Sequence, residues 1–228
     1  MFAIDSSDDA SSGSSPSRKQ SPQKLRIAGA PAGKIRVIPN GVDMERFRPP
    51  SPQERAGARA SLGIAPEEIV HLFFGRDRHI KGADTLWRAM DHVPGRTLVV
   101  VVGASRETLA ELRRRSRVID VASVADTRPL FWASDSIVVP SRGEGSPYVL
   151  VEALASGLPA VITAIPPLLD VTAGIANRRA MPVDDHAALA TMLGTVTLLR
   201  LPARPQTIER YNLNHWVRRT TELYATTT

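Results

Sequence analysis

Short apolar segments alternate with helix-length segments through the middle of this sequence, and that alternation limits the fold more than any other feature. Each apolar run has the length of a strand and precedes a stretch with apolar residues at helical spacing. The pairs are 69–74 with 82–92, 97–102 with 106–115, and 137–139 with 147–156, and a further apolar run, 160–163, follows. The alternation predicts an α/β fold in which helices cover both faces of a parallel sheet.

The loops between strand and helix are where such a fold binds its ligands. In parallel sheets these loops meet beyond the carboxyl ends of the strands, which places their side chains around one crevice. The loops are 75–81, 103–105, 123–126 and 140–146. We therefore expect a functional site to be built from these segments.

The chain is long enough for one such domain. With 228 residues, of which 43% are hydrophobic, it can bury one good core but not two complete domains of this kind. Residues 5–24 are rich in Ser, Asp, Pro and Lys and have few apolar side chains to offset the entropy of ordering. We predict a disordered tail or linker remnant over residues 1–33 and a folded domain over residues 34–228.

Composition excludes several classes of function. The absence of cysteine excludes disulfides, thiolate metal sites and thiol nucleophiles, and no histidines have metal-ligand spacing. The net charge of +6 suits phosphate, an anionic surface or an ordinary solvated face. Nucleic acid is the rival interpretation, but the arginines are dispersed and no nucleic-acid-binding motif is present. Without an apolar run of about 20 residues or a secretion signal, we expect a soluble, cytoplasmic protein that is at most peripheral to a membrane.

A basic, glycine-bounded loop follows the first predicted strand. Gly75 and Gly82 permit close backbone approach, the start of the next helix favours anions, and Arg76 and Lys81 can neutralise a diphosphate. The spacing is not that of a Walker A motif. The loop therefore predicts a phosphate grip, with a merely solvated basic loop as the alternative.

The loop after the run 137–139 contains a helix start signal. Ser146 fits the N-cap and Pro147 the first helical position, so the amides of Tyr148 and Val149 are donors for a phosphate or sugar oxygen. Pro147 itself has no N–H.

Two carboxylates flank this helix start. Glu144 precedes it and Glu152 follows eight positions later, so both could face one cleft and accept from sugar hydroxyls. The alternative is that Glu152 is an exposed helical residue and Glu144 an ordinary loop charge.

The run Pro140–Pro159 strongly resembles the signature of glycosyltransferase family four, whose Glu-x7-Glu element matches Glu144 and Glu152. Further matches occur in the same order at Ile38–Asp43, Gly75-Arg76, Lys81-Gly82, Val102-Gly103 and Ala133–Asp135. The resemblance covers Lys34 to Tyr224. It implies the Rossmann-like C-terminal half of a two-domain GT-B enzyme, which binds the sugar donor.

The resemblance also implies roles for individual residues. Arg76 and Lys81 would hold the donor diphosphate, Glu144 would contact hydroxyls of the transferred sugar, and Glu152 would bind the ribose. The implied catalytic set is therefore Arg76, Lys81 and Glu144. The implied donor-binding set is Gly75, Gly103, Val124, Gly145, Ser146, Tyr148, Val149 and Glu152, with Gly103 and Val124 near the base.

The implied reaction is transfer of a hexose from a UDP-, GDP- or ADP-sugar with retained configuration, without a metal or other cofactor. Electrostatic stabilisation of the leaving diphosphate suffices for it. Glu144 could instead act as a nucleophile of the glycosidase kind, but no second carboxylic acid is placed to donate the proton. The sequence departs from the family pattern at Pro166–Asp170, where a glycine pair and a glutamate are usual, and at Ala104-Ser105.

The acceptor-binding half of the family is not found before Lys34. We expect either an enzyme that needs an acceptor-domain protein partner, an isolated nucleotide-sugar-binding module, or a truncated inactive fragment. Residues 211–224 resemble the family's closing helix, which packs on the other half, so an exposed apolar patch is predicted near Trp216 and Tyr224.

Overall fold

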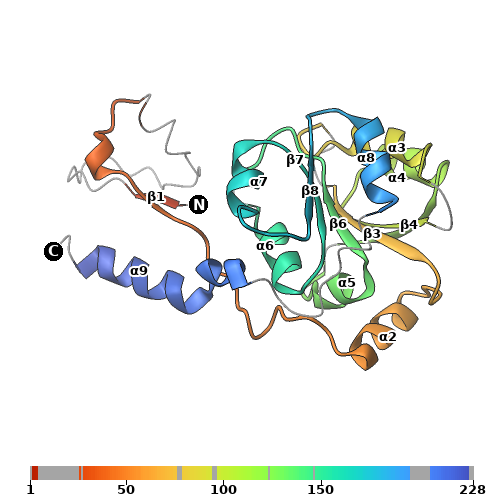
Figure 1. The fold of residues 1–228 in the computed structure, drawn as a ribbon, viewed down its shortest axis with the longest axis horizontal. Coiled ribbons are helices and arrows are strands. Elements are labelled where there is room, and N and C mark those ends of the chain that lie inside the picture. Colours follow the sequence, from red (N-terminus) through yellow and green to blue (C-terminus); the bar gives the residue numbers. More distant parts are fainter. Residues whose placement is uncertain are drawn as a thin grey trace. The chain divides into compact units, whose positions relative to one another are not determined.

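The computed structural model describes residues 2–4, 26, 28–75, 79–93, 97–122, 124–145, 147–195 and 206–225 (Figure 1). These residues belong to two compact units. One unit comprises Met44–Glu209, and the other comprises Met1–Asp43 with Arg210–Thr228.

The larger unit contains a six-stranded sheet in the order β5-β4-β3-β6-β7-β8, and all its neighbouring strands are parallel. After β3 the chain adds β4 and β5 on one side, whereas β6, β7 and β8 lie on the other. The direction of winding therefore reverses between β3 and β6. The strands, in sheet order, are β5 (Arg117–Val121), β4 (Thr97–Val102), β3 (Ile69–Phe74), β6 (Ser136–Val139), β7 (Ala160–Thr163) and β8 (Arg178–Met181).

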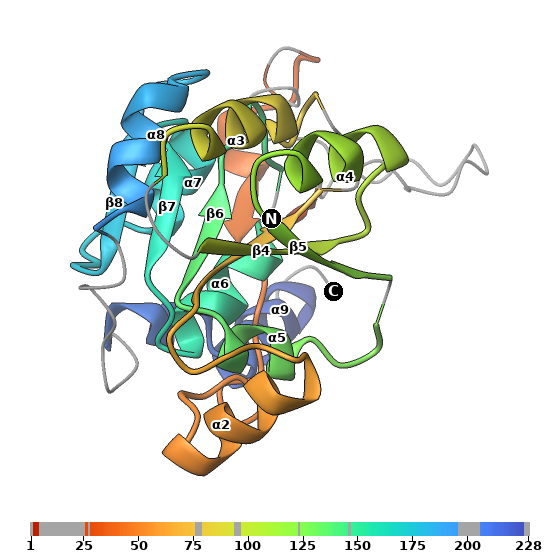
Figure 2. The ribbon, with the colours of Figure 1, turned by 90° about the vertical axis from the view of Figure 1, so that its right-hand side faces the viewer.

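Helices cover both faces of this sheet, which confirms the predicted fold class (Figure 2). On one face, α3, α4 and α8 pack on side chains that alternate along the strands, such as Val99 and Val101. On the other face, α5 packs on β3, and α6 packs on β6 and β7. The helices are α2 (Pro52–Ser61), α3 (Ala83–Met90), α4 (Arg106–Arg113), α5 (Arg128–Ala133), α6 (Tyr148–Ala155), α7 (Pro166–Val171) and α8 (His186–Leu193).

An ion-pair cluster joins α2 to the amino ends of β3 and β6. Asp135 accepts from Arg55 at 2.5 Å, from Arg59 at 3.4 Å and from the Val70 amide at 2.9 Å. Arg59 also donates to backbone carbonyl groups, including that of Glu68 at 2.6 Å. We call Arg55, Arg59 and Asp135 the amino-edge cluster. It fixes α2 on the sheet, and the cap of Ser51 and Glu54 starts that helix.

His71 is fully buried in β3. Its Nδ1 lies 2.7 Å from the hydroxyl oxygen of Ser136 on β6. Burial lowers the pKa of His71 to about 4, so the ring is neutral near pH 7.

The sequence after Met181-Pro182-Val183 predicts an N-cap at Asp184 and a helix through about Leu199, and the start of α8 differs from this prediction by one residue. Asp185 is the N-cap and accepts from the Ala188 amide at 2.8 Å, whereas Asp184, the predicted cap, has a left-handed φ of 64°. The helix ends at Leu193, before the predicted end near Leu199. Either of the two consecutive aspartates could cap the helix as far as the sequence shows. Only the backbone conformation determines which of them does.

The described residues of the smaller unit include a two-stranded antiparallel sheet and a helix near the C-terminus. β1 (Phe2–Ile4) pairs with β2 (Arg36–Ile38), so a strand forms inside the predicted tail, whereas residues 5–25 lie outside the described residues. The 3-10 helices are η1 (Ala32–Lys34) and, at the border of the units, η3 (Gln206–Tyr211).

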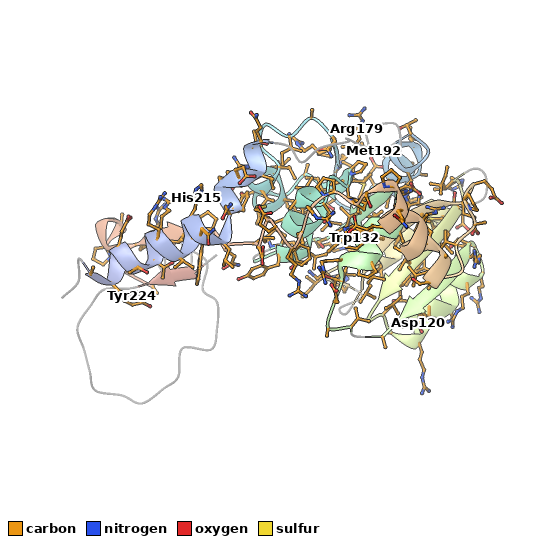
Figure 3. All side chains as sticks on the ribbon, turned by 90° about the horizontal axis from the view of Figure 1, so that it is seen from below. Asp120, Trp132, Arg179, Met192, His215 and Tyr224 are labelled. Carbon is orange, nitrogen blue, oxygen red and sulfur yellow. The ribbon has the colours of Figure 1, made fainter. Side chains whose placement is uncertain are left out.

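The predicted closing helix is present as α9 (Leu213–Ala225). Val42 is hydrogen-bonded to the residues at the start of α9. The Val42 amide donates to the Tyr211 carbonyl, and the Val42 carbonyl accepts from the Leu213 amide. Leu213, Val217 and Tyr224 are exposed, and Tyr224 projects away from the helix (Figure 3). Trp216 is half-buried, because its Cβ lies against Gly41. Among the described helices, none has the length and apolarity to span a bilayer.

Candidate functional site

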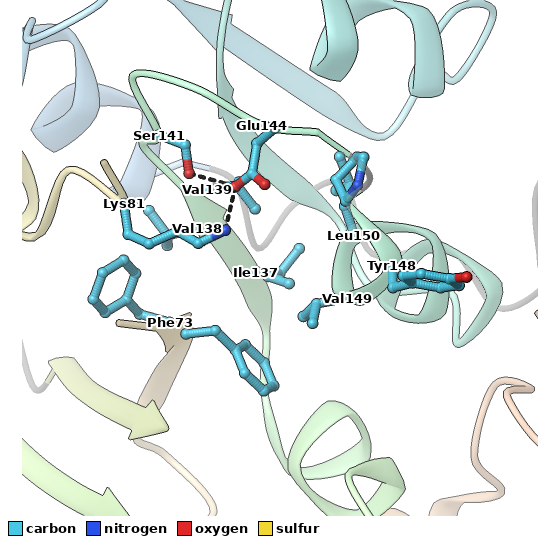
Figure 4. Close-up of a pocket in the computed structure, with 12 residues that line it drawn as sticks. Phe73, Lys81, Ile137, Val138, Val139, Ser141, Glu144, Tyr148, Val149 and Leu150 are labelled. Carbon is cyan, nitrogen blue, oxygen red and sulfur yellow. Dashed lines mark hydrogen bonds and ion pairs between the residues drawn. The ribbon is translucent and has the colours of Figure 1, made fainter. Parts of the chain in front are cut away.

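The reversal of winding between β3 and β6 places two loops side by side at the carboxyl edge of the sheet. A cavity of about 270 Å³ opens there, bounded by the β3–α3 loop, the β6–α6 loop and the first turn of α6 (Figure 4). In doubly wound sheets this reversal is the place where ligands bind. The cavity is lined by Phe73, Phe74, Lys81, Ile137, Val138, Val139, Ser141, Glu144, Pro147, Tyr148, Val149 and Leu150.

Lys81 and Glu144 meet in this cavity. The Lys81 Nζ donates to Glu144 Oε1 at 2.7 Å, and the Ser141 hydroxyl donates to the same oxygen at 2.7 Å (Figure 4). Glu144 is nearly buried, with 8% of its side chain exposed, whereas 32% of the Lys81 side chain is exposed. The structure thus brings together two predicted site residues that are 63 positions apart.

The two loops are also in backbone contact. Gly82 has a φ of +66°, and a Cβ at this position would lie 2.0 Å from the carbonyl oxygen of Pro140. The Arg142 amide donates to the carbonyl of Ile80 at 2.8 Å. Only glycine fits such an approach, so the conformation of the Lys81 loop depends on that of the Glu144 loop.

The first turn of α6 points at the same cavity. Pro147 is the N-cap and the helix begins at Tyr148, so Pro147 is not the first helical residue as predicted. The amides of Leu150 and Val151 are bonded to the Pro147 carbonyl. Tyr148 and Val149, the predicted amide donors, line the cavity. Ser146, the predicted cap, lies outside the described residues.

Glu152 is placed differently from Glu144. It does not line the cavity, although the sequence suggested that both carboxylates could face one cleft. Burial raises the pKa of Glu152 to about 7, and the charge of Arg46 lowers it to a lesser extent. The pKa of Tyr148 is raised by burial and then by the Glu152 charge, which places these two residues on one side of α6.

The remaining predicted site residues are dispersed. Arg76 lies outside the described residues, and Gly75 is buried, with its amide bonded to Val102. Gly103 has a φ of +65° and no atom within 4 Å of a Cβ built on it. Val124, 39% exposed, and Gly145 lie at exposed loop positions. Gly103 and Val124 follow β4 and β5, so they lie on the β4 side of β3.

Sequence reasoning missed four polar residues around the cavity. Ser141 bonds to Glu144, and Arg142 forms ion pairs with Asp84 and Asp184. Ser141 and Arg142 belong to the same loop as Glu144, which is the signal that could have identified them. Asp184 was instead interpreted as a cap.

Metal binding has no support in the part of the chain that the structure describes. There, no group of three or more His, Cys, Asp or Glu side chains is placed to hold an ion. The polar groups of the lining residues include the Lys81 ammonium, the Glu144 carboxylate, the Ser141 hydroxyl and the amides of a helix start. Such a set can bind an anion beside hydroxyl groups.

The model of the family of group 1 glycosyl transferases matches residues 68–197, which is more than half of the chain. The chain therefore belongs to the group 1 glycosyltransferases. It is 31% identical over 194 residues to the D-inositol 3-phosphate glycosyltransferase of Xylanimonas cellulosilytica, covering 78% of this chain and 46% of that relative.

Solved glycosyltransferase-like structures share the fold. The HepE protein of Anabaena, solved in complex with UDP-glucose, has a TM-score of 0.79 at 21% identity, covering 90% of this chain and 61% of that one. Sucrose-phosphate synthase of Thermosynechococcus elongatus has a TM-score of 0.74 at 27% identity, covering 90% and 55%. The chain thus spans about half the length of the proteins it matches.

Proposed function

We propose that this chain is the donor-binding half of a retaining glycosyltransferase that transfers a hexose from a nucleoside-diphosphate sugar. The observation that carries the proposal is the Lys81–Glu144 pair, 2.7 Å apart, in a cavity at the reversal of winding. A cation beside a carboxylate suits a ligand that joins a phosphate to a sugar, because the cation meets phosphate oxygens and the carboxylate accepts from hydroxyls.

Each group then has a defined task. Lys81 binds a diphosphate oxygen and stabilises the charge that develops as the diphosphate leaves. The amides at the start of α6 add to this through the helix dipole, and Glu144 orients the sugar. Arg76 is proposed as a second diphosphate ligand on the resemblance to the family alone.

Retention without a protein nucleophile is part of the proposal. Among the described residues that line the cavity, Glu144 is the one carboxylate, so a double displacement would have no carboxylic acid there to protonate the leaving group. Electrostatic stabilisation of the leaving diphosphate does not require such an acid.

The relatives support a proposal for the donor and one for the acceptor. Anabaena HepE binds UDP-glucose, which supports a UDP-, GDP- or ADP-sugar as donor. Because the relatives are about twice as long, we propose that a second domain holds the acceptor. A module that binds the donor without transferring it is the alternative, since the same cavity serves both functions.

Calorimetric titration with UDP-, GDP- and ADP-glucose tests donor binding. We expect K81A to raise the Kd about 10- to 100-fold, because one charge-assisted hydrogen bond to phosphate contributes roughly 1.5–3 kcal/mol. R113A removes a cation from the exposed surface of α4 and should leave the Kd unchanged. Equal affinities of K81A and the unmodified protein would refute the diphosphate assignment.

Sugar transfer separates the enzyme from the module. Radiolabelled donor incubated with this chain alone should yield no transferred sugar, whereas addition of an acceptor-binding domain should restore transfer. NMR of the product then reports the anomeric configuration. An inverted product would overturn retention, and transfer by this chain alone would overturn the need for a second domain.

A further inference from the structure

Arg142 is the basic residue closest in sequence to Glu144. Its place in a strand-to-helix loop of the site suggests that it binds phosphate. Its side chain is only 19% exposed and points into a cluster of three loops. The guanidinium group is forked onto Asp84, with Nη1 and Nη2 each 2.7 Å from a different carboxylate oxygen. Its Nη1 also donates to the His79 carbonyl at 2.6 Å, and its Nη2 lies 2.5 Å from Asp184.

The charge of this cluster argues against a phosphate ligand. Two carboxylates face one guanidinium, so the cluster formed by Arg142, Asp84 and Asp184 carries net negative charge. A phosphate would have to displace a carboxylate that already accepts two parallel, charge-assisted hydrogen bonds from the guanidinium. Lys81, by contrast, lines the cavity with a third of its side chain exposed.

The backbone around Asp184 supports a fixed geometry. Asp184 is the one non-glycine residue with positive φ among the described residues, at 64°. A left-handed conformation is unfavourable for a residue with a Cβ, and it persists where surrounding contacts determine it. Here Asp184 bonds to Arg142 and also accepts from the Thr85 hydroxyl at 3.2 Å.

One guanidinium thus ties together the loops that follow β3, β6 and β8. His79 lies two positions before Lys81, and Arg142 lies two positions before Glu144. The bonds of Arg142 to the carbonyls of His79 and Ile80 therefore set how closely the two loops approach.

We infer that Arg142 is a positioning residue, which holds the Lys81 loop and the Glu144 loop together through Asp84 and Asp184 and does not itself contact the diphosphate. The inference rests on the proposed nucleotide-sugar site. It distinguishes Arg142 from Lys81, although both are cations in strand-to-helix loops of the same edge.

The two possible roles of Arg142 predict different donor affinities for D84N, and R142Q completes the comparison. If Arg142 were a phosphate ligand, D84N would release its guanidinium, and affinity for UDP-glucose, or for whichever donor binds, would stay equal or rise. For a positioning residue, each variant lowers affinity about tenfold, and the double variant loses no more than either single one. R142K, which keeps the charge but not the fork, should recover only part of the affinity.

Amide hydrogen exchange tests the same inference without a donor. In R142Q and D84N, peptides covering 79–82 and 140–145 should exchange at least about tenfold faster, whereas β4 keeps the protection of the unmodified protein. R113A is the matched control and should change neither. Unchanged exchange in both loops, or uniformly faster exchange that includes β4, would overturn the positioning role. Absence of donor binding by the unmodified protein would overturn the proposed function but leave this readout intact.

Discussion

The two ends of the central strands carry ion pairs of similar chemistry in different surroundings. At the amino end, Asp135 accepts from Arg55, Arg59 and a backbone amide. At the carboxyl end, Glu144 accepts from Lys81 and the Ser141 hydroxyl. Both carboxylates are largely buried, with 16% and 8% of their side chains exposed.

The partners of the cations separate the two sites. Arg59 is itself buried, and it donates to the carbonyls of Ala65, Glu68 and Ala133 as well as to Asp135. A ligand has no access to such a group. Lys81 instead borders a cavity, where a second anion has room beside Glu144. Ion pairing alone therefore does not identify a site, whereas ion pairing beside a cavity at the carboxyl edge does.

The largest expected effect is on stability, in D135A. Removal of this carboxylate leaves Arg59 buried without its anion, which should lower the free energy of unfolding by about 3–5 kcal/mol. Urea denaturation measures this loss, and the protein that remains folded should bind donor normally. D120N, in an exposed pair, should change stability by less than about 0.5 kcal/mol. If D135A had the stability of the unmodified protein, the ion pairs at the amino ends of the strands would not be structural, and the contrast with the carboxyl ends would be wrong.

A pair of glycine variants sharpens the comparison within the carboxyl edge. Gly82 and Gly103 have nearly identical φ angles, but a Cβ at Gly82 would collide with Pro140, and one at Gly103 would meet nothing. G103A should cost about 1 kcal/mol for the left-handed conformation alone. G82A should cost about 3 kcal/mol, because the two loops must also separate. If the two variants lowered the melting temperature equally, the contact between Gly82 and Pro140 would contribute nothing to stability.

The smallest expected effect is a pH dependence set by Glu152. Because its pKa is about 7, the carboxylate proposed to bind ribose is mostly protonated at pH 6 and mostly ionised at pH 8. Donor affinity should therefore rise up to about tenfold over this range. Calorimetry at both pH values measures the rise. E152Q should show no such rise, because the diphosphate of a nucleotide sugar is esterified at both ends and does not titrate between pH 6 and pH 8.

The same residue predicts the opposite trend for stability. A carboxyl whose pKa is raised above its ordinary 4.5 on folding contributes stability that is present below pH 4.5 and lost as the pH rises through 7. The unmodified protein should therefore lose stability between pH 5 and pH 8 relative to E152Q. If the two proteins had parallel profiles, Glu152 would not titrate in this range.

Much of the fold was predictable because the central strands are continuous apolar runs. β3 and β4 are buried on both faces, so their sequences are almost entirely apolar, with His71 within β3 and Thr97 at the start of β4 as the polar residues. The edge strands β5 and β8 were missed because they are partly exposed and contain charged residues such as Asp120 and Arg179. The cap of Ser51 and Glu54 was a usable signal for α2.

The sequence predicted individual site residues but not which of them contact one another. Lys81 and Glu144 each follow an apolar run, which placed them in binding loops. Their pairing depends on β3 lying next to β6, and periodicity does not determine strand order. For the same reason Arg142 gave no indication that its partners, Asp84 and Asp184, belong to two other loops.

The contact between Gly82 and Pro140 has a consequence for altering this protein. Since the backbones of the β3–α3 and β6–α6 loops touch, neither loop can gain or lose a residue without shifting the other. Gly103, which follows β4, adjoins open space instead, and Val124, which follows β5, is exposed. Changes of length that alter specificity therefore belong in the loops after β4 and β5, where an insertion leaves the Lys81–Glu144 pair in place.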